Sequence, residues 1–480
     1  MNRIALLVVA TGLLLAAAWF VMFRQETSPE RRQESRALAV PNRSGRTPAF
    51  HVFAPKEERI RVARSILGQM TLARAEVLGE LKDDLVLLSR EPEIFELVCQ
   101  AYEERATLSP YEAMAFADFF ASVRHPRFVE PVRRLFLHED FQVRHKGIHA
   151  AATQRDQRLT PELHTMYREL RQKSAEGGAN ITGVLIEAAG NCGGAAALPL
   201  LAEALQDPRA AVRGSALIVA RQTKRTEMVG RVASLLGDPE PSVRLEAAHA
   251  LVALGDANGT AALLALLDPR EPSTAEHVLA IIRHQELVDA RPRLAQTAHE
   301  FEGDLLSNVR VTQVILGDKE QLGLMRTTLG DAEAPPAKRI DALVGLAAAS
   351  EEEDIPVLLS IVRAGDPRDV HAISHGLNLT DRRPPLALVE ALIEGGMITQ
   401  TAVLMETPRR CGNSLLPVLG AELKKARDDH RVLFLIGCLG LIGTREARDE
   451  VQNHHHAFPT FVEQQMRLMD LDAIREGQDL

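Results

Sequence analysis

The sequence has 480 residues, of which 46% are hydrophobic, 25% charged and 4% aromatic, and its formal net charge is −9. This apolar content is enough for a packed core and excludes a wholly disordered chain. The four cysteines are scattered and form no Cys-x-x-Cys pair, which argues against a disulfide-built scaffold and a zinc knuckle. The acidic balance argues against a general nucleic-acid binder, because such proteins gain affinity by neutralising phosphates.

The N-terminus begins with an apolar run of twenty uncharged residues, Ile4–Phe23. A helix of that length spans the roughly 30 Å of hydrocarbon in a bilayer. A cleaved signal peptide is the alternative, with the small residues 16–18 as the cleavage site. Because the apolar run continues beyond these alanines, the sequence favours a retained membrane anchor over residues 1–23.

Residues 24–56 are rich in arginine, contain prolines and show no sustained period, which predicts a flexible linker. Arg3 favours a cytoplasmic N-terminus, whereas Arg24 and the arginines that follow it favour the opposite orientation. A short N-terminus before a single span usually stays inside. We therefore expect an exported body, periplasmic or otherwise extracytoplasmic, which is secreted if the N-terminal segment is cleaved.

The remaining chain, residues 57–480, repeats itself. The segment 197–220 aligns with 228–256, and their turn residues Asp207 and Asp238 are 31 positions apart. Another Asp-Pro turn follows at Asp268, and weaker copies lie upstream and downstream. Two apolar stripes of helical period in each unit predict a helix–turn–helix repeat, present in about ten copies.

Each unit can be interpreted from its residues. Leu201 and Leu205 recur at helical spacing on one face of a first helix, and Pro208 ends that helix. Val212 and Ala216 then begin the apolar stripe of a second helix. One such helix pair cannot cover its own apolar face, so neighbouring pairs must stack. The predicted fold class is all-α, an α-solenoid of stacked helix pairs.

The recurring Asp and Arg side chains predict an ion-pair ladder in which each Arg bridges the turn Asp of an adjacent unit. This arrangement keeps the donors of a partly buried guanidinium satisfied. The residues assigned to this structural ladder are Asp140, Arg144, Asp207, Arg213, Asp238, Arg244 and Arg310.

The pattern D-P-x-x-x-V-R-x-x-A-x-x-A-L is complete at 238–251 and matched at 207–216. It resembles the HEAT repeat, and more narrowly the HEAT-like type found in phycobilisome lyase proteins. The resemblance implies an α-solenoid whose second helices line a concave surface that binds proteins. That implication is architectural, because fold alone does not fix function.

Two enzyme-like alternatives follow from the same resemblance: a bilin lyase and a metal-dependent hydroxylase with His-Glu pairs after the repeat Arg. Here Arg144 is followed by His145-Lys146, and Arg244 by Leu245, so both positions depart from the hydroxylase pattern. No bilin-contacting residue carries over. Cys192 lies in a glycine-rich stretch predicted to be a turn, with no base beside it. We assign no catalytic, cofactor-binding or metal-ligating residue and expect no cofactor.

The spacing of the histidines favours structural roles over metal binding. His145 and His149 are four residues apart, as are His371 and His375, so each pair shares a helix face but lacks a third ligand. The run 454–456 places consecutive side chains in divergent directions on a helix, which disfavours a shared metal ion.

Binding on the concave face remains as the functional hypothesis. His149 and His249 occupy equivalent positions of their second helices, and Glu246, Glu276 and His277 are predicted to share that surface. The sequence therefore predicts a non-catalytic scaffold or adaptor, tethered to a membrane, that binds protein or peptide partners and no nucleic acid. A rigid spacer in an envelope assembly is a further alternative.

Overall fold

The computed structural model describes residues 55–69, 75–105, 108–173, 179–395, 407–454, 462, 465–466 and 468–471. Every regular element in these residues is a helix, and no strand occurs among them. The predicted all-α class is therefore confirmed. Within the same residues, no helix combines the length and apolar character needed to cross a membrane. The expected anchor, 1–23, lies outside the described residues, as does nearly all of the linker.

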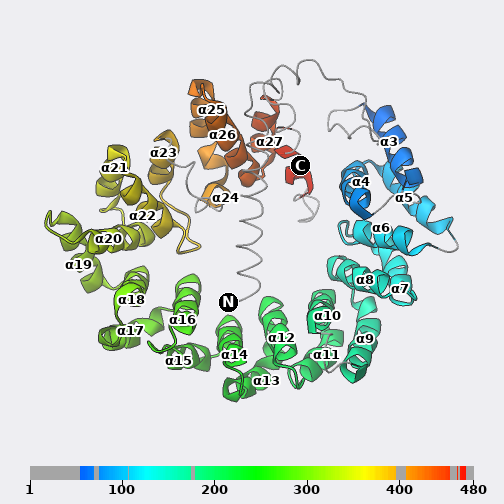
Figure 1. The fold of residues 1–480 in the computed structure, drawn as a ribbon, viewed down its shortest axis with the longest axis horizontal. Helices are drawn as coiled ribbons and strands as arrows, with labels where there is room; N and C mark the ends of the chain where they lie inside the picture. The colour runs from blue at the N-terminus through cyan, green and yellow to red at the C-terminus, as the bar shows by residue number, and fades with distance from the viewer. Residues whose placement is uncertain are drawn as a thin grey trace.

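The helices alternate along the chain between an inner and an outer layer of a curved array (Figure 1). The even-numbered helices form the inner layer and are called the inner helices. They are α4 (Ala75–Leu88), α6 (Pro110–Phe120), α8 (Phe141–Gln154), α10 (Ala179–Cys192), α12 (Ala210–Gln222), α14 (Pro241–Ala253), α16 (Pro272–His284), α18 (Gly303–Ile315), α20 (Pro336–Ala349), α22 (Pro367–Leu377), α24 (Thr407–Cys411) and α26 (Asp429–Ile442).

The odd-numbered helices form the outer layer and are called the outer helices. They are α3 (Lys56–Gln69), α5 (Pro92–Glu103), α7 (Val129–Phe136), α9 (Thr160–Lys173), α11 (Leu198–Ala204), α13 (Val229–Ser234), α15 (Asn258–Ala265), α17 (Arg291–Thr297), α19 (Lys319–Gly330), α21 (Ile355–Ala364), α23 (Leu386–Glu394), α25 (Leu416–Lys425) and α27 (Arg445–Gln452). Short 3-10 turns connect some of them: Pro126–Phe128, Gln157–Leu159, Ala195–Ala197, Thr226–Met228, Leu235–Gly237, Val288–Ala290, Ala298–Glu300 and Gly412–Leu415.

The unit of α11 and α12 follows the sequence pattern. Leu201 is fully buried on α11, which ends just before the Asp-Pro turn. Val212 and Ala216 are fully buried on α12. Small residues let neighbouring inner helices approach closely, because a Cβ at Gly190 of α10 would meet the Val219 side chain of α12 at 2.1 Å.

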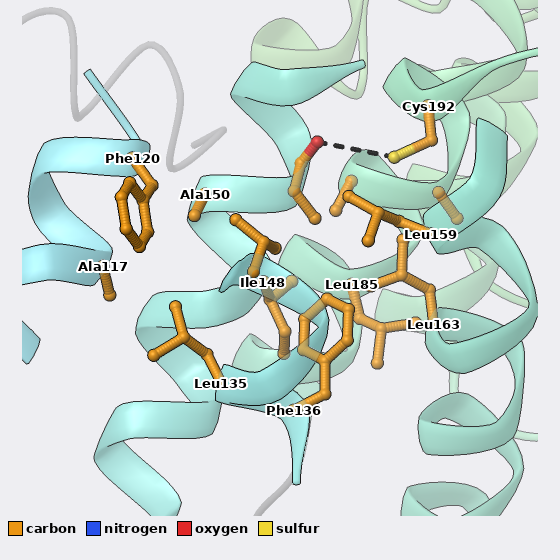
Figure 2. Packing of buried hydrophobic residues seen from close by; sticks show 14 of the residues in the cluster. Ala117, Phe120, Leu135, Phe136, Ile148, Ala150, Leu159, Leu163, Leu185 and Cys192 are labelled. Carbon is orange, nitrogen blue, oxygen red and sulfur yellow. Dashed lines mark hydrogen bonds between the residues drawn. The ribbon is translucent and has the colours of Figure 1, made fainter. Parts of the chain in front are cut away.

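The core runs between the two layers from one unit into the next, so no unit is buried alone. Figure 2 shows this for α7 to α10, where side chains of four successive helices and of the 3-10 turn Gln157–Leu159 interdigitate. The labelled residues there include Leu135, Phe136, Ile148, Leu159, Leu163 and Leu185. Each is buried, with at most 6% of its surface exposed.

The loop after α22 reaches back across two units on the C-terminal side of the array. Arg382 donates from Nε and Nη2 to the carboxylate of Glu286 at 2.7 and 3.0 Å, and from Nη2 to the carbonyl of Ile315 at 3.3 Å. Asp381 lies 3.4 Å from Nδ1 of His284. The ends of α16 and α18 are therefore tied to the loop that follows α22.

The array curls until its two ends meet (Figure 1). Asp470 contacts Arg448 on α27 and also Arg90, which lies 380 positions earlier in the turn between α4 and α5. The described part of the chain therefore has the outline of a ring, with the inner helices around its centre.

Candidate binding surface on the inner helices and the rim

One inter-unit ion pair joins the residues assigned to the ladder. Arg213 on α12 donates from Nε and Nη2 to the two carboxylate oxygens of Asp238, both at 2.7 Å, and from Nη1 to the carbonyl of Asp207 at 2.8 Å. Only 11% of the Arg213 side chain and 4% of the Asp238 side chain are exposed. Hydrogen bonding by Arg213 holds the pKa of Asp238 below its ordinary value. The guanidinium therefore binds its own turn and the next one together.

Asp207 and Asp268 each pair with an arginine two residues further along the chain. Asp207 is fully buried and accepts from Nε and Nη2 of Arg209, two residues on, at 2.8 and 3.0 Å. It also accepts from the Tyr167 hydroxyl at 2.9 Å. Burial opposes ionisation of Asp207, but these hydrogen bonds outweigh it and keep its pKa low. Asp268 pairs in the same way with Arg270, and that hydrogen bonding lowers its pKa to about 2.

Arg244 and Arg310, the next two ladder arginines, do not bind the carboxylate of a turn aspartate. Arg244 donates to the carbonyls of Asp238 and Pro239 in its own turn, at 2.8 and 3.1 Å. Within the described residues, the side chain of Arg310 on α18 makes no hydrogen bond or ion pair. The expected ladder is therefore reduced to one rung, Arg213–Asp238, because a repeat Arg reaches the carbonyls of its own turn whether or not a carboxylate stands beyond it.

Asp140 and Arg144 hold the turn between α7 and α8. The Asp140 carboxylate accepts from the backbone N–H of Gln142 at 2.7 Å and so caps α8. Arg144 donates to the carbonyls of His138 and Glu139 at 2.7 and 2.8 Å. Leu137, at the end of α7, lies directly before this fixed turn.

The predicted concave residues lie on inner helices. His149 is exposed on α8, and its ring meets that of His145 edge-on, with centroids 4.9 Å apart. Burial, and then the nearby charges of His145 and Lys146, lower the pKa of His149. Lys146 is itself paired with Asp118 on α6 at 2.7 Å. The two histidines are therefore more readily neutral than free imidazole.

On α14, Glu246 and His249 are both partly exposed. Burial, and then the charges of Arg221 on α12 and His284 on α16, lower the pKa of His249 to about 4. His249 on α14 thus lies near charged groups of both neighbouring inner helices, α12 and α16. Its low pKa leaves it uncharged at neutral pH. A charged His249 at that position would add to the cations already around it.

On α16, Glu276 is exposed and His277 is partly exposed. Nδ1 of His277 donates to the carbonyl of Ser273 at 2.7 Å, which fixes the ring against its own helix. The five predicted binding residues therefore sit on three inner helices, and the structure does not gather them into one cluster.

Arg283 is a buried cation that the sequence analysis did not single out. It is 8% exposed and donates from Nη1 to the Thr312 hydroxyl of α18 at 2.9 Å, while its buried Nε has no acceptor. Burial lowers its pKa to about 10, although Glu276 opposes the effect. The available signal was its position beside the apolar stripe that contains Ile282.

The sequence analysis also missed an exposed apolar surface formed by Leu137, Phe141 and Tyr111, called the rim surface. Leu137, at the end of α7, is 80% exposed and lies between two hollows of about 850 and 530 Å³. Phe141, 48% exposed, lines the smaller hollow. Tyr111, 56% exposed, adjoins Pro110 in the wall of the larger one. A signal existed in the sequence, since Leu137 and Phe141 are apolar residues flanking a polar turn.

The cysteines offer no reactive thiol at a surface. All four are buried. The Cys192 thiol donates to the carbonyl of Ala151 at 3.4 Å (Figure 2), and burial raises its pKa to about 12. Cys192 is the last residue of α10, so the helix runs further than the sequence analysis expected, which had placed a turn there. Within the described residues, no group of three His, Cys, Asp or Glu side chains is placed to hold a metal ion.

Comparison with known proteins supports the repeat architecture. A family model of HEAT repeats matches residues 197–282. This match confirms the resemblance to the HEAT family: the matched segment consists of HEAT repeats within an all-helical repeat protein. No curated relative matches the sequence.

Two solved structures show a distant likeness. Human deoxyhypusine hydroxylase, in complex with glycerol, is 18% identical, with a TM-score of 0.22, over 66% of this chain and 98% of that one. The crystal structure of an engineered protein is 15% identical, with a TM-score of 0.12, over 65% and 98% of the two chains.

Proposed function

We propose that this protein is a non-catalytic scaffold or adaptor whose HEAT array binds protein or peptide partners. The observation that carries the proposal is Leu137, a large apolar side chain held in solvent between two hollows. Burying one exposed leucine contributes about 2 kcal/mol, and a contiguous patch of exposed apolar side chains marks an interaction site. Phe141 and Tyr111 extend the apolar surface on either side.

The turn beneath Leu137 supports this role. Arg144 and Asp140 use their hydrogen bonds to fix the backbone from His138 to Val143. An anchor on a fixed turn loses little conformational freedom on binding, which favours affinity. The exposed or partly exposed residues of the inner helices supply polar contacts for the same or a second partner: His149, Glu246, His249, Glu276 and His277.

Membrane tethering is a second part of the proposal. Its support is the uncharged run Ile4–Phe23, whose length fits a bilayer. With the N-terminus inside, the array is exported. Protease added to intact cells would then degrade the array and spare a cytoplasmic control protein. Protection of the array until the cells are lysed would contradict the proposed orientation.

The binding proposal is tested by a photo-crosslinking amino acid placed at Leu137 of the full-length protein in its native membranes. Leu324 on the outer helix α19 is 56% exposed and serves as the matched control position. The proposal predicts discrete protein adducts at 137 that are lost when Phe141→Asp is added, with none at 324. Equal adducts at both positions, or none at 137, would contradict it.

A further inference from the structure

The segment 468–471 joins the two ends of the array through contacts to both. Met469, 3% exposed, belongs to the core cluster of the C-terminal units. Leu471, 7% exposed, belongs instead to the core cluster that begins at Ala63. Met469 and Leu471, two residues apart, are therefore buried in the cores at opposite ends of the array.

Asp470 makes polar contacts at the same place. It accepts from Nε and Nη2 of Arg448 at 2.9 and 3.1 Å, and its carboxylate lies 3.4 Å from Nη1 of Arg90. Only 6% of the Asp470 side chain is exposed. The two bonds to Arg448 hold the carboxylate on the C-terminal side, while the single longer contact to Arg90 crosses to the N-terminal side.

We propose that residues 468–471 form a latch that closes the array into a ring and opens by releasing Arg90 and Leu471. The Asp470–Arg90 pair and the burial of Leu471 are single contacts, whereas a stable interface between separate proteins takes about 20–30 residues on each side. The array closes because both ends belong to one chain, which gives them a high effective concentration. Opening therefore costs little, and Asp470 stays with Arg448 when it occurs.

Opening changes the curvature of the array. A solenoid deforms by small rotations at each unit, so releasing the ends widens the wall formed by the inner helices. If those helices bind a partner, as proposed above, the latch sets the shape that the partner meets. This last step rests on the proposed function, whereas the latch itself does not.

The test measures the distance between the two ends without any partner. Nitroxide labels are attached to Arg61→Cys on α3 and Gln452→Cys on α27 of the full-length protein. The native cysteines are all buried, and a sample without introduced cysteines measures their background labelling. Pulsed dipolar spectroscopy then gives the distance distribution.

The latch predicts one narrow distribution in the parent protein and a broader, longer one in Arg90→Gln, which leaves Asp470–Arg448 intact. Arg445→Gln, an exposed arginine on α27, is the matched control and keeps the narrow distribution.

Three results would overturn the proposal: a broad distribution in the parent protein, an unchanged one in Arg90→Gln, or loss of the dipolar signal on dilution with unlabelled protein. The last result would mean that the ends pair between copies. Asp470→Asn provides a second variant, and circular dichroism reports whether each variant remains helical. Failure of the photo-crosslinking test at Leu137 would leave this distance measurement unaffected.

Discussion

Two neighbouring turns of the array share the Asp-Pro dipeptide and have different ion pairs. At the first, Asp238 is buried and is bound by Arg213 of the preceding unit. At the second, the Asp268 side chain is 31% exposed and is bound by Arg270, two positions further along the chain. The corresponding position after Asp238 is Glu240, which offers no cation.

The comparison teaches that a local arginine competes with the inter-unit one. An Arg two positions after the turn Asp reaches both carboxylate oxygens without bridging units, as Arg209 also does at Asp207. An Asp followed by Glu240 leaves its carboxylate to the neighbouring unit. The repeat pattern D-P-x-x-x-V-R leaves this position unspecified, so the pattern alone does not determine where a rung forms.

Helix packing also differs on the two sides of α14. Helices α12 and α14 lie along each other, whereas α16 meets α14 and α15 at only a few positions. The core cluster of the N-terminal half ends near Leu251, and a separate cluster around Leu279 begins there. Helix α14 therefore packs less extensively against α16 than against α12.

The largest expected effect comes from breaking the buried rung. Asp238→Asn leaves an amide where Arg213 needs a carboxylate, and we expect the free energy of unfolding to fall by about 2 kcal/mol. Asp268→Asn removes an exposed, local pair and should lower it much less. Urea denaturation of the two variants measures the difference, and equal losses would contradict the distinction between the turns.

A smaller effect is expected from pH at the junction. His249 has a folded-state pKa of about 4, below its ordinary value near 6.5, so the unfolded chain binds its proton more readily. Its contribution is fully present above about pH 6.5 and is lost progressively as the pH falls toward 4. Stability measured against pH should show a flatter acid limb in His249→Gln.

His299→Gln is the control for that measurement, because His299 is exposed in the structure. It should retain the acid limb of the parent protein. An identical acid limb in His249→Gln and the parent protein would show that His249 is not the group responsible.

The smallest expected effect is the creation of a new rung. Arg270→Glu gives Asp268 the same neighbour that Asp238 has, so its carboxylate becomes available to Arg244. A double-mutant cycle between Arg244→Ala and Asp268→Ala should then give a coupling energy absent from the parent background. If no coupling appears, the identity of the residue two positions after the Asp does not control the rung.

The sequence predicted the helix pairs well, because their signal is local. Val212 and Ala216 were expected in the stripe of a second helix, and both are buried. Which acceptor each repeat arginine binds was harder to predict. Arg213 and Arg244 have the same spacing from their turns, yet they bind different partners. That difference depends on the neighbouring unit, which periodicity does not describe.

The surfaces were the least predictable part. Leu137 has a solvent-exposed side chain because of the hydrogen bonds that shape its turn, and a hydrophobic pattern alone assigns leucine to the core. The contact of Asp470 with Arg90 depends on curvature summed over every unit. No local feature of the sequence carries that sum.

Native-state hydrogen exchange tests the central claim most directly, because it reads the strength of each junction separately. With rising denaturant, amides of α12 and α14 should exchange together, at a free energy of opening above that of α15 and α16. Asp238→Asn should lower the value for α12 and α14 toward that of α15 and α16. Equal opening free energies on both sides of the α14–α16 junction in the parent protein would contradict the account.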